Sequence, residues 1–255
     1  MATGRPLADV LAEAERVSGA AIEAGVSLKL IGGAAVCLHS SSARQQPLKR
    51  KYGDLDFVTP SRQRGAVERL FTTLGYDSEV RFNTLNGDRR LLYLDPENGR
   101  QVDVFVDVVR MCHVIDLRDR LDLGGPCLAP ADLLVSKLQI YEINRKDLVD
   151  LVALLMDHPM ADHDDEAINA AYVARLTADN WGLYRTLQLN TERLRSMVTE
   201  VPVDSTLVVQ RLDELWRSID AQPKSLRWRL RARVGDRMSW YELPEEVRQP
   251  YQAEG

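Results

Sequence analysis

The stretch GDLDFV (residues 53–58) decides the fold of this chain. Its acidic and apolar residues alternate, so it predicts a β-strand on which Asp54 and Asp56 project from one face. Upstream, LIGGAAV (residues 30–36) predicts a short strand, a glycine turn and the start of a helix. Together the two stretches indicate mixed α/β structure around a pair of carboxylates.

The paired carboxylates indicate a cation-binding site. Like charges held side by side are unfavourable unless a cation lies between them. Hard oxygen ligands on a rigid strand suit Mg²⁺, which takes few protein carboxylates together with substrate phosphates. A lone pair of aspartates is more often solvated structure, so Gly32 and Gly33 matter, because they let a phosphate approach backbone N–H groups at a helix N-terminus. The alternative interpretation of the glycines is a tight turn between a strand and a helix.

A third carboxylate comes from QVDVFVDVV (residues 101–109), in which Asp103 and Asp107 share a face of an apolar strand. Burying an unpaired carboxylate costs several kcal/mol, so at least one of the two should meet a cation, a metal or water. The sequence does not decide between them, and for Asp107 a salt bridge is an equal alternative.

The order of these motifs resembles that of the nucleotidyltransferase superfamily, whose pattern is a hydrophobic residue and Gly followed by Gly or Ser, then DhDh and later hDh. Within it the chain is most similar to the AbiEii-type branch, which includes toxins of toxin–antitoxin and phage-defence systems, and less similar to small antibiotic nucleotidyltransferases. Arg50, upstream of Asp54, and the stretch from Lys137 to Asp150 match further motifs of that branch. The resemblance covers residues 25–155.

The resemblance implies that an acceptor hydroxyl attacks the α-phosphate of a nucleoside triphosphate and that pyrophosphate leaves. It implies Mg²⁺ or Mn²⁺ held by Asp54, Asp56 and Asp103, which together with Lys137 form the implied catalytic set. The implied nucleotide-binding residues are Gly32, Gly33, Arg50, Lys137, Arg145 and Asp147.

Two departures from the family concern contacts to the triphosphate. Ala34 follows the glycines where many members have Ser or Thr, and Tyr52-Gly53 stands where a hydroxyl residue usually precedes the first aspartate. The metal site is unaffected by either change. The charged residues downstream of the sheet have an alternative interpretation as ion pairs on a helix surface, and such pairs contribute little to stability. These residues are Lys137, Arg145, Asp147 and Asp150.

The implied acceptor is RNA, such as a tRNA end, or a protein, and the toxin branch implies a cognate antitoxin protein as a partner. A small-molecule antibiotic is the alternative acceptor and would need an acidic pocket; a noncatalytic member that binds nucleotide or a partner is the third hypothesis. The net charge of -5 does not attract nucleic acid, but the basic clusters at 44–51 and 224–233 could contact phosphates. Residues 225–234 fit a strand or a helix, and their arginines could instead form a solvated face paired with Glu242, Glu245 and Glu246.

Over its 255 residues the chain predicts an α/β (α+β) nucleotidyltransferase-type domain at 1–125, with a mixed sheet flanked by helices, and a helical domain at 126–255. Predicted helices cover 7–24, 34–38, 63–74, 166–177, 181–200 and 205–221, and two more begin at Pro130 and near Lys146. Further predicted strands cover 78–83, 90–94 and 102–109.

The sequence also bears on the compartment. No stretch approaches the roughly 20 apolar residues that span a bilayer, and the acidic N-terminal segment is unlike a signal peptide. Cys37, Cys112 and Cys127 are odd in number and widely spaced, which argues against a disulfide framework. We therefore expect a cytoplasmic protein with no membrane partner.

Overall fold

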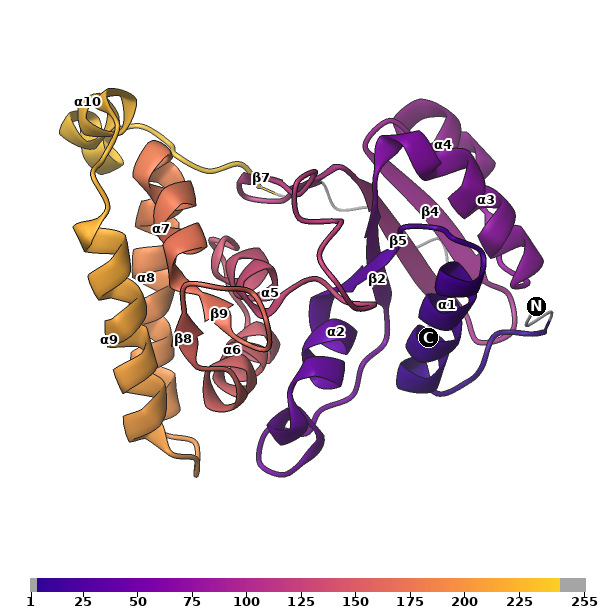
Figure 1. The fold of residues 1–255 in the computed structure, drawn as a ribbon, viewed down its shortest axis with the longest axis horizontal. Coiled ribbons are helices and arrows are strands. Elements are labelled where there is room, and N and C mark those ends of the chain that lie inside the picture. The colour runs from indigo at the N-terminus through magenta and orange to yellow at the C-terminus, as the bar shows by residue number, and fades with distance from the viewer. Residues whose placement is uncertain (1–3, 244–255) are drawn as a thin grey trace, which may run out of the picture.

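The computed structural model describes residues 4–243, which form a mixed sheet and a group of helices beside it (Figure 1). The strand order across the five-stranded sheet is β1-β2-β5-β4-β3. The strands are Lys29–Ile31 (β1), Leu55–Thr59 (β2), Asp77–Ser78 (β3), Arg90–Asp95 (β4) and Arg100–Val106 (β5). β2 and β5 run parallel, whereas the other neighbours run antiparallel. The predicted mixed sheet is therefore confirmed.

Helices α1 (Val10–Glu23) and α3 (Arg64–Thr73) cover one face of this sheet (Figure 1). Phe71 of α3 stacks on Tyr93 of β4 with 4.4 Å between ring centroids, and it makes an edge contact with Phe57 of β2 at 6.1 Å. Successive side chains of a strand point to opposite faces. Asp56 of β2 therefore lies on the face that α1 and α3 leave open.

The prediction of a strand over 78–83 is wrong, because β3 ends at Ser78 and helix α4 (Val80–Asn86) follows. The side chain of Asn83 explains the change. Its amide nitrogen donates to the carbonyl oxygen of Leu92 at 3.1 Å, and its Oδ1 accepts the N–H of Leu92 at 2.7 Å. These hydrogen bonds satisfy the backbone groups of Leu92 on the edge of β4, which a longer β3 would otherwise pair with.

Helices form most of the secondary structure outside this sheet. Helix α2 (Gly32–His39) follows β1. Six helices follow the sheet: Pro130–Leu138 (α5), Arg145–Asp157 (α6), Ala170–Asp179 (α7), Trp181–Val198 (α8), Ser205–Ala221 (α9) and Leu226–Val234 (α10). Most of the six begin at a side chain that accepts a backbone N–H, namely Asn144, Asn169, Asn180, Asp204 or Ser225. No helix within residues 4–243 is long and apolar enough to cross a membrane. The helical region after the sheet matches the predicted fold class, while a domain boundary near 125 stays a prediction.

Helix α7 begins later than the predicted position 166. Residues Ile168–Asn169 (β9) first pair in parallel with Met160–Ala161 (β8). The side chain of Asn169 then accepts the N–H of Tyr172 and starts the helix. A short strand pairing that the sequence does not signal therefore takes the first residues of the predicted helix.

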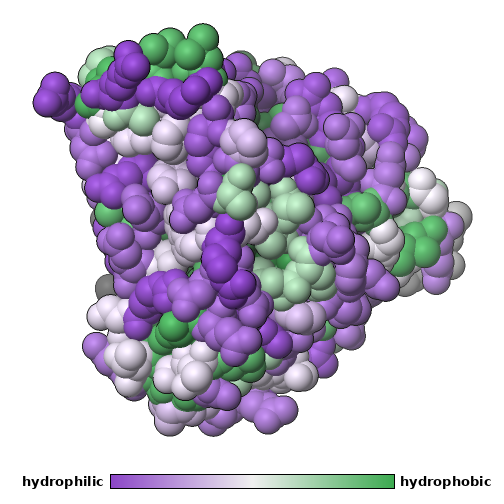
Figure 2. Space-filling model, turned by 60° about the vertical axis from the view of Figure 1, so that its left-hand side comes forward, coloured by the Kyte–Doolittle hydropathy of each residue, from purple (hydrophilic) through white to green (hydrophobic). Residues whose placement is uncertain are grey.

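The ambiguous stretch 225–234 is helical, as α10. Trp228 makes an edge contact with the ring of Tyr184 of α8 at 5.3 Å, whereas Leu226 and Leu230 are 65% and 52% exposed. Figure 2 shows apolar side chains among strongly hydrophilic ones at the upper end of the molecule, where α10 lies in Figure 1. The predicted partner acids Glu245 and Glu246 lie outside the described residues.

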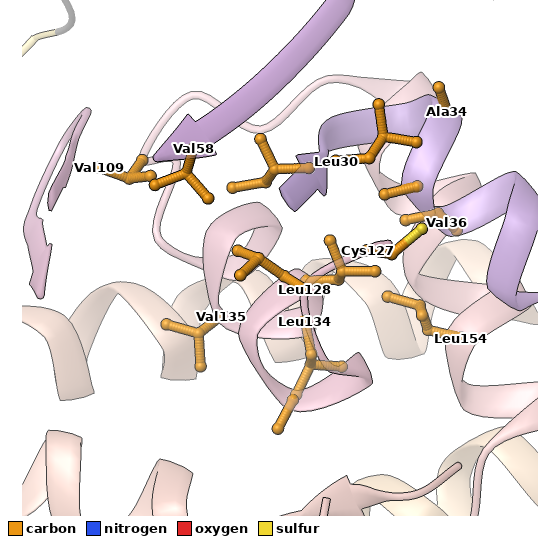
Figure 3. Close-up of a cluster of buried hydrophobic side chains, with 14 of the residues drawn as sticks. Leu30, Ala34, Val36, Val58, Val109, Cys127, Leu128, Leu134, Val135 and Leu154 are labelled. Carbon is orange, nitrogen blue, oxygen red and sulfur yellow. The ribbon is translucent and has the colours of Figure 1, made fainter. Parts of the chain in front are cut away.

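A buried apolar cluster joins the sheet to the helices that follow it (Figure 3). Leu30 of β1 forms a parallel bridge with Cys127, and its carbonyl oxygen accepts the N–H of Leu128 at 3.0 Å. Leu134 of α5 and Leu154 of α6 pack in the same cluster. This contact fixes α5 and α6 against α2, so residues far apart in sequence meet at the start of α2.

Candidate functional site

Three carboxylates meet on the open face of the sheet, and we call Asp54, Asp56 and Asp103 the acidic row. Asp56 of β2 is the direct neighbour of Asp103 of β5 in the parallel register. Asp54 directly precedes β2 and shares its face with Asp56. Of the two candidates for a third carboxylate, the structure thus brings Asp103 beside the pair.

Asp107 has a different place. It has a φ of 60°, a left-handed conformation that interrupts the predicted strand 102–109 and separates β5 from β6 (Val108–Arg110). Its Oδ1 accepts the N–H of Ser61 at 2.8 Å, and its own N–H donates to Thr59 at 2.9 Å. The expectation that it shares a regular strand face with the third acid is wrong, because Asp107 forms the bend at the end of β5.

The acidic row carries more negative charge than its surroundings balance. Burial, followed by the charges of Asp103 and Asp54, raises the pKa of Asp56 to about 7, although Lys137 and Arg90 act in the opposite direction. Loss of surrounding water and the charge of Asp103 also raise the pKa of Asp54, which Lys146 of α6 opposes. Asp54 is the more exposed of the pair. An added cation at this place would relieve the repulsion.

Asp103 is held by its own partners. Arg90 Nε donates to one carboxylate oxygen at 2.7 Å, and Gln101 Nε2 donates to the other at 2.8 Å. The Arg90 guanidinium also lies 5.2 Å from the ring centroid of Phe105. Both oxygens of Asp103 therefore already accept a hydrogen bond, although each keeps a second lone pair.

The donor set fits a divalent cation in part. Asp54 and Asp56 offer hard oxygen atoms and an excess of negative charge, which suit Mg²⁺ or Mn²⁺. In the part of the chain that the structure describes, no three acidic, histidine or cysteine side chains are grouped closely enough to hold a metal ion. Asp103 would therefore have to turn away from Arg90 to bind a metal ion together with Asp54 and Asp56. This set of three metal ligands stays a prediction.

The glycine pair lets the start of α2 approach the acidic row. Gly32 has a φ of +77°, and a Cβ there would lie 2.5 Å from Asp56 Oδ2. A Cβ on Gly33 would collide with the Arg50 guanidinium and lie 3.2 Å from Tyr52 Cδ1. The positive φ and the contact with Asp56 require a glycine at position 32, whereas a side chain at position 33 would displace Arg50. The first residues of α2 thus lie beside the acidic row.

Two cations from distant segments meet beside this helix start, and we call Arg50, Lys137, Asp147 and Asp150 the ion-pair network. Arg50 Nε and Nη2 donate to the two oxygens of Asp150 at 2.8 and 2.7 Å. Lys137 Nζ lies 2.6 Å from Asp147 Oδ1 and 2.8 Å from Asp150 Oδ2. Asp150 thereby bridges the loop before β2 to α5.

The ion-pair network is largely buried, so it is not a set of surface ion pairs. Asp150 is 1% exposed and Lys137 is 9% exposed. Burial alone would lower the pKa of Lys137, but Asp150 and Asp147 outweigh this and hold it above its ordinary value. The ammonium therefore stays charged. Arg145 stands apart, since it is exposed and makes no side-chain hydrogen bond or ion pair within residues 4–243.

The sequence interpretation missed several residues of the site. Arg90 and Gln101 hold Asp103, and Lys146 lies near enough to Asp54 to affect its pKa. Gln101 could have been found, because it lies two residues before Asp103 on the same strand face. Arg90 required the register between β4 and β5, which a single sequence does not provide.

No protein-family model matches the chain, and no curated protein matches its sequence. Among solved structures, it is similar to the lincosamide antibiotic adenylyltransferase LnuA with lincomycin bound, at 17% identity over 58% of this chain and 98% of that one, with a TM-score of 0.43. The solution structure of the antibiotic-resistance factor ANT(2'')-Ia is 14% identical over 66% of this chain and 93% of that one, with a TM-score of 0.41. An antigenic nucleotidyltransferase-like protein from Paracoccidioides brasiliensis is 14% identical over 87% of this chain and 96% of that one, with a TM-score of 0.40. At these scores the activity of the neighbours does not transfer to this chain.

Proposed function

We propose that this chain is a nucleotidyltransferase that moves a nucleoside monophosphate from a nucleoside triphosphate to an acceptor hydroxyl. The observation that supports this most is that the acidic row and the two cations of the ion-pair network, Arg50 and Lys137, lie on either side of the start of α2. The acidic row suits a cation, and the ion-pair network places Arg50 and Lys137 where phosphate oxygens could replace their carboxylate partners. A metal-bound triphosphate carries both kinds of charge.

The triphosphate end of the site is formed by cations and backbone donors. A guanidinium forks onto phosphate oxygens and an ammonium acts as a point charge, which are the proposed roles of Arg50 and Lys137. Asp147 positions Lys137 through its 2.6 Å contact. Gly32 and Gly33 form the first residues of α2, and the positive end of a helix favours an anion.

Asp54 and Asp56 are the proposed ligands of Mg²⁺ or Mn²⁺, with Asp103 as the third. When bound, such an ion neutralises phosphate charge and orients the triphosphate for in-line attack. In the free protein Arg90 and Gln101 hold the Asp103 carboxylate, which would serve the ion or accept the proton of the acceptor hydroxyl once it has turned away from Arg90.

The transfer itself exchanges one bond for another. The acceptor oxygen bonds to the α-phosphorus, the bond from that phosphorus to the oxygen bridging the β-phosphate breaks, and pyrophosphate leaves with that oxygen. The hydroxyl proton goes to a carboxylate of the acidic row. The contribution of the chain is positioning and the neutralisation of charge.

The proposed acceptor is RNA, such as a tRNA end, or a protein, in a cytoplasmic toxin with a cognate antitoxin of the AbiEii type. A cavity that shares Arg50 with the site favours an anionic acceptor. This cavity of about 510 Å³ is lined by four basic residues, Arg44, Lys49, Arg50 and Lys51, and by one acid, Asp9. A cationic antibiotic would need the reverse balance of charge.

The test is label transfer from each radiolabelled nucleoside triphosphate with Mg²⁺, in the presence and absence of total RNA. The Asp54→Asn/Asp56→Asn variant should lose transfer. The matched control is Asp162→Asn/Asp165→Asn, which removes two exposed acids from the loop between β8 and β9 and should keep it. Transfer that survives the first double substitution would overturn the proposed site, and triphosphate binding without transfer to any acceptor would support a noncatalytic protein. Growth arrest on expression, relieved by the product of an adjacent gene, would support the toxin branch.

A further inference from the structure

A cavity of about 200 Å³ opens next to the acidic row, between α4, the strands around Phe105 and the segment ending at Leu243. Arg90 belongs to both places, because it lines this cavity and its Nε donates to Asp103. A molecule that enters the cavity therefore contacts Arg90, the residue that is hydrogen-bonded to Asp103. None of the roles assigned above uses this cavity.

The wall of the cavity is basic. Arg89, Arg90 and Arg110 line it together with a single acid, Glu242. The charge of Arg90 is balanced by Asp103, but Arg89 and Arg110 are exposed. The only ion pair of Arg89 within residues 4–243 is a 3.5 Å contact with its exposed neighbour Asp88, which contributes little. The cavity therefore suits an anionic group and repels a cationic one.

The wall of the cavity is also aromatic, and the volume of the cavity limits what it can enclose. Phe82 is half-buried in it, and the Arg90 guanidinium covers the ring of Phe105. Nucleobases stack on aromatic rings and on guanidinium planes. Pockets that enclose a drug-sized molecule measure about 300–1,000 Å³, so about 200 Å³ suits one end of a longer molecule better than a whole antibiotic.

We propose that this cavity receives the end of a single-stranded RNA acceptor and that Arg90 couples its arrival to the acidic row. RNA phosphates bind Arg89 and Arg110, and a phosphate draws the Arg90 guanidinium from Asp103. The freed carboxylate then faces the cation and the ribose hydroxyl. This inference rests on the proposed transferase function, and the bonds exchanged are those already given for the transfer.

The first test of the cavity needs no catalysis. Binding of a single-stranded RNA with a 3'-deoxy end is measured across a series of salt concentrations in metal-free buffer. For single strands the slope of log K against log salt changes by about 0.7 for each phosphate contact. Arg89→Gln and Arg110→Gln should each flatten the slope by about that amount, while Arg69→Gln, an exposed change on α3 at the opposite face, should not. Unchanged slopes in both cavity variants would overturn the RNA site.

The second test measures coupling. Kd for the same unreactive RNA is compared with and without Mg²⁺ in the wild type, Arg90→Gln and Arg69→Gln; metal bound by the RNA itself cancels between proteins. Coupling between two sites is reciprocal and typically about fivefold or more. The wild type and Arg69→Gln should show it, and Arg90→Gln should lose it. Equal coupling in all three proteins would overturn the role of Arg90.

Further outcomes separate this inference from the proposed function. Arg90→Lys keeps a cation beside Asp103 if Arg90→Gln does not fold, and it should weaken the coupling because an ammonium lacks the planar fork. Mg²⁺-dependent transfer to a protein or an antibiotic but not to RNA would overturn the RNA cavity and leave the transferase standing. Absence of both triphosphate binding and transfer would overturn the transferase, and with it this inference.

Discussion

Asp56→Asn should stabilise the metal-free protein at neutral and alkaline pH. The folded protein raises the pKa of Asp56 to about 7, whereas the ordinary value is 3.8. The folded state therefore holds the proton more tightly than the unfolded state, and stability falls as the pH rises through this interval. About three pKa units at 1.36 kcal/mol each correspond to about 4 kcal/mol above pH 7. The asparagine has no charge to bury and avoids this cost.

The assay is urea denaturation of both proteins in buffer containing a metal chelator. We expect the variant to exceed the wild type by about 2–4 kcal/mol at pH 8, because some of the cost is relieved by water entry. The difference should shrink steadily as the pH falls from 7 toward 3.8, the unfolded-state pKa, below which Asp56 becomes protonated in both states. Asp54→Asn is the matched control and should show a smaller gain, since Asp54 is more exposed.

Addition of Mg²⁺ should reduce the advantage of Asp56→Asn at pH 8. An ion that binds only the folded state stabilises it by about 2.7 kcal/mol at a hundredfold excess over its Kd. The wild type should gain this stability and Asp56→Asn should gain much less. In the metal-free buffer, a variant that is less stable than the wild type at pH 8, or a gain independent of pH, would refute the reasoning from buried charge.

Three further changes test the glycine turn and the cations. Gly33→Ala should weaken nucleoside triphosphate binding about tenfold by displacing Arg50, measured by titration calorimetry, and unchanged affinity would contradict the close contact. Asp150→Asn should lower the free energy of unfolding by about 3–5 kcal/mol because it leaves Lys137 and Arg50 without their shared partner, and a loss below 1 kcal/mol in urea denaturation would argue against the bridge. Lys146→Ala should raise KM for the triphosphate about threefold at low salt with little change in kcat, because an exposed charge contributes modestly, and an effect that persists at high salt would contradict an electrostatic role.

The acidic row was predictable because strand alternation is local. The period of two places Asp54 and Asp56 on one face whatever the rest of the chain does. The choice of Asp103 over Asp107 was not predictable, since it depends on a left-handed residue that binds the N–H of Ser61. That contact joins segments that are distant in sequence.

Outside the site as well, the secondary structure was predictable where the signal is local and not where it depends on contacts between distant segments. The capped helices α8 and α9 lie close to their predicted ranges, because caps and helical periodicity are local signals. Helix α4 was mistaken for a strand, because the Asn83 side chain takes over the edge of β4. The residues of the ion-pair network could be identified from the sequence, but the bridging position of Asp150 could not, because it depends on how α6 packs against the loop before β2.

The bridge made by Asp150 determines what an incoming phosphate must displace. In the free protein Arg50 and Lys137 are already satisfied by two carboxylates, those of Asp150 and Asp147. A phosphate reaches these cations only by displacing the carboxylates, and its binding would therefore also release the link between the loop before β2 and helices α5 and α6. Under the proposed function, nucleotide binding would thus loosen the wall of the site that the nucleotide enters.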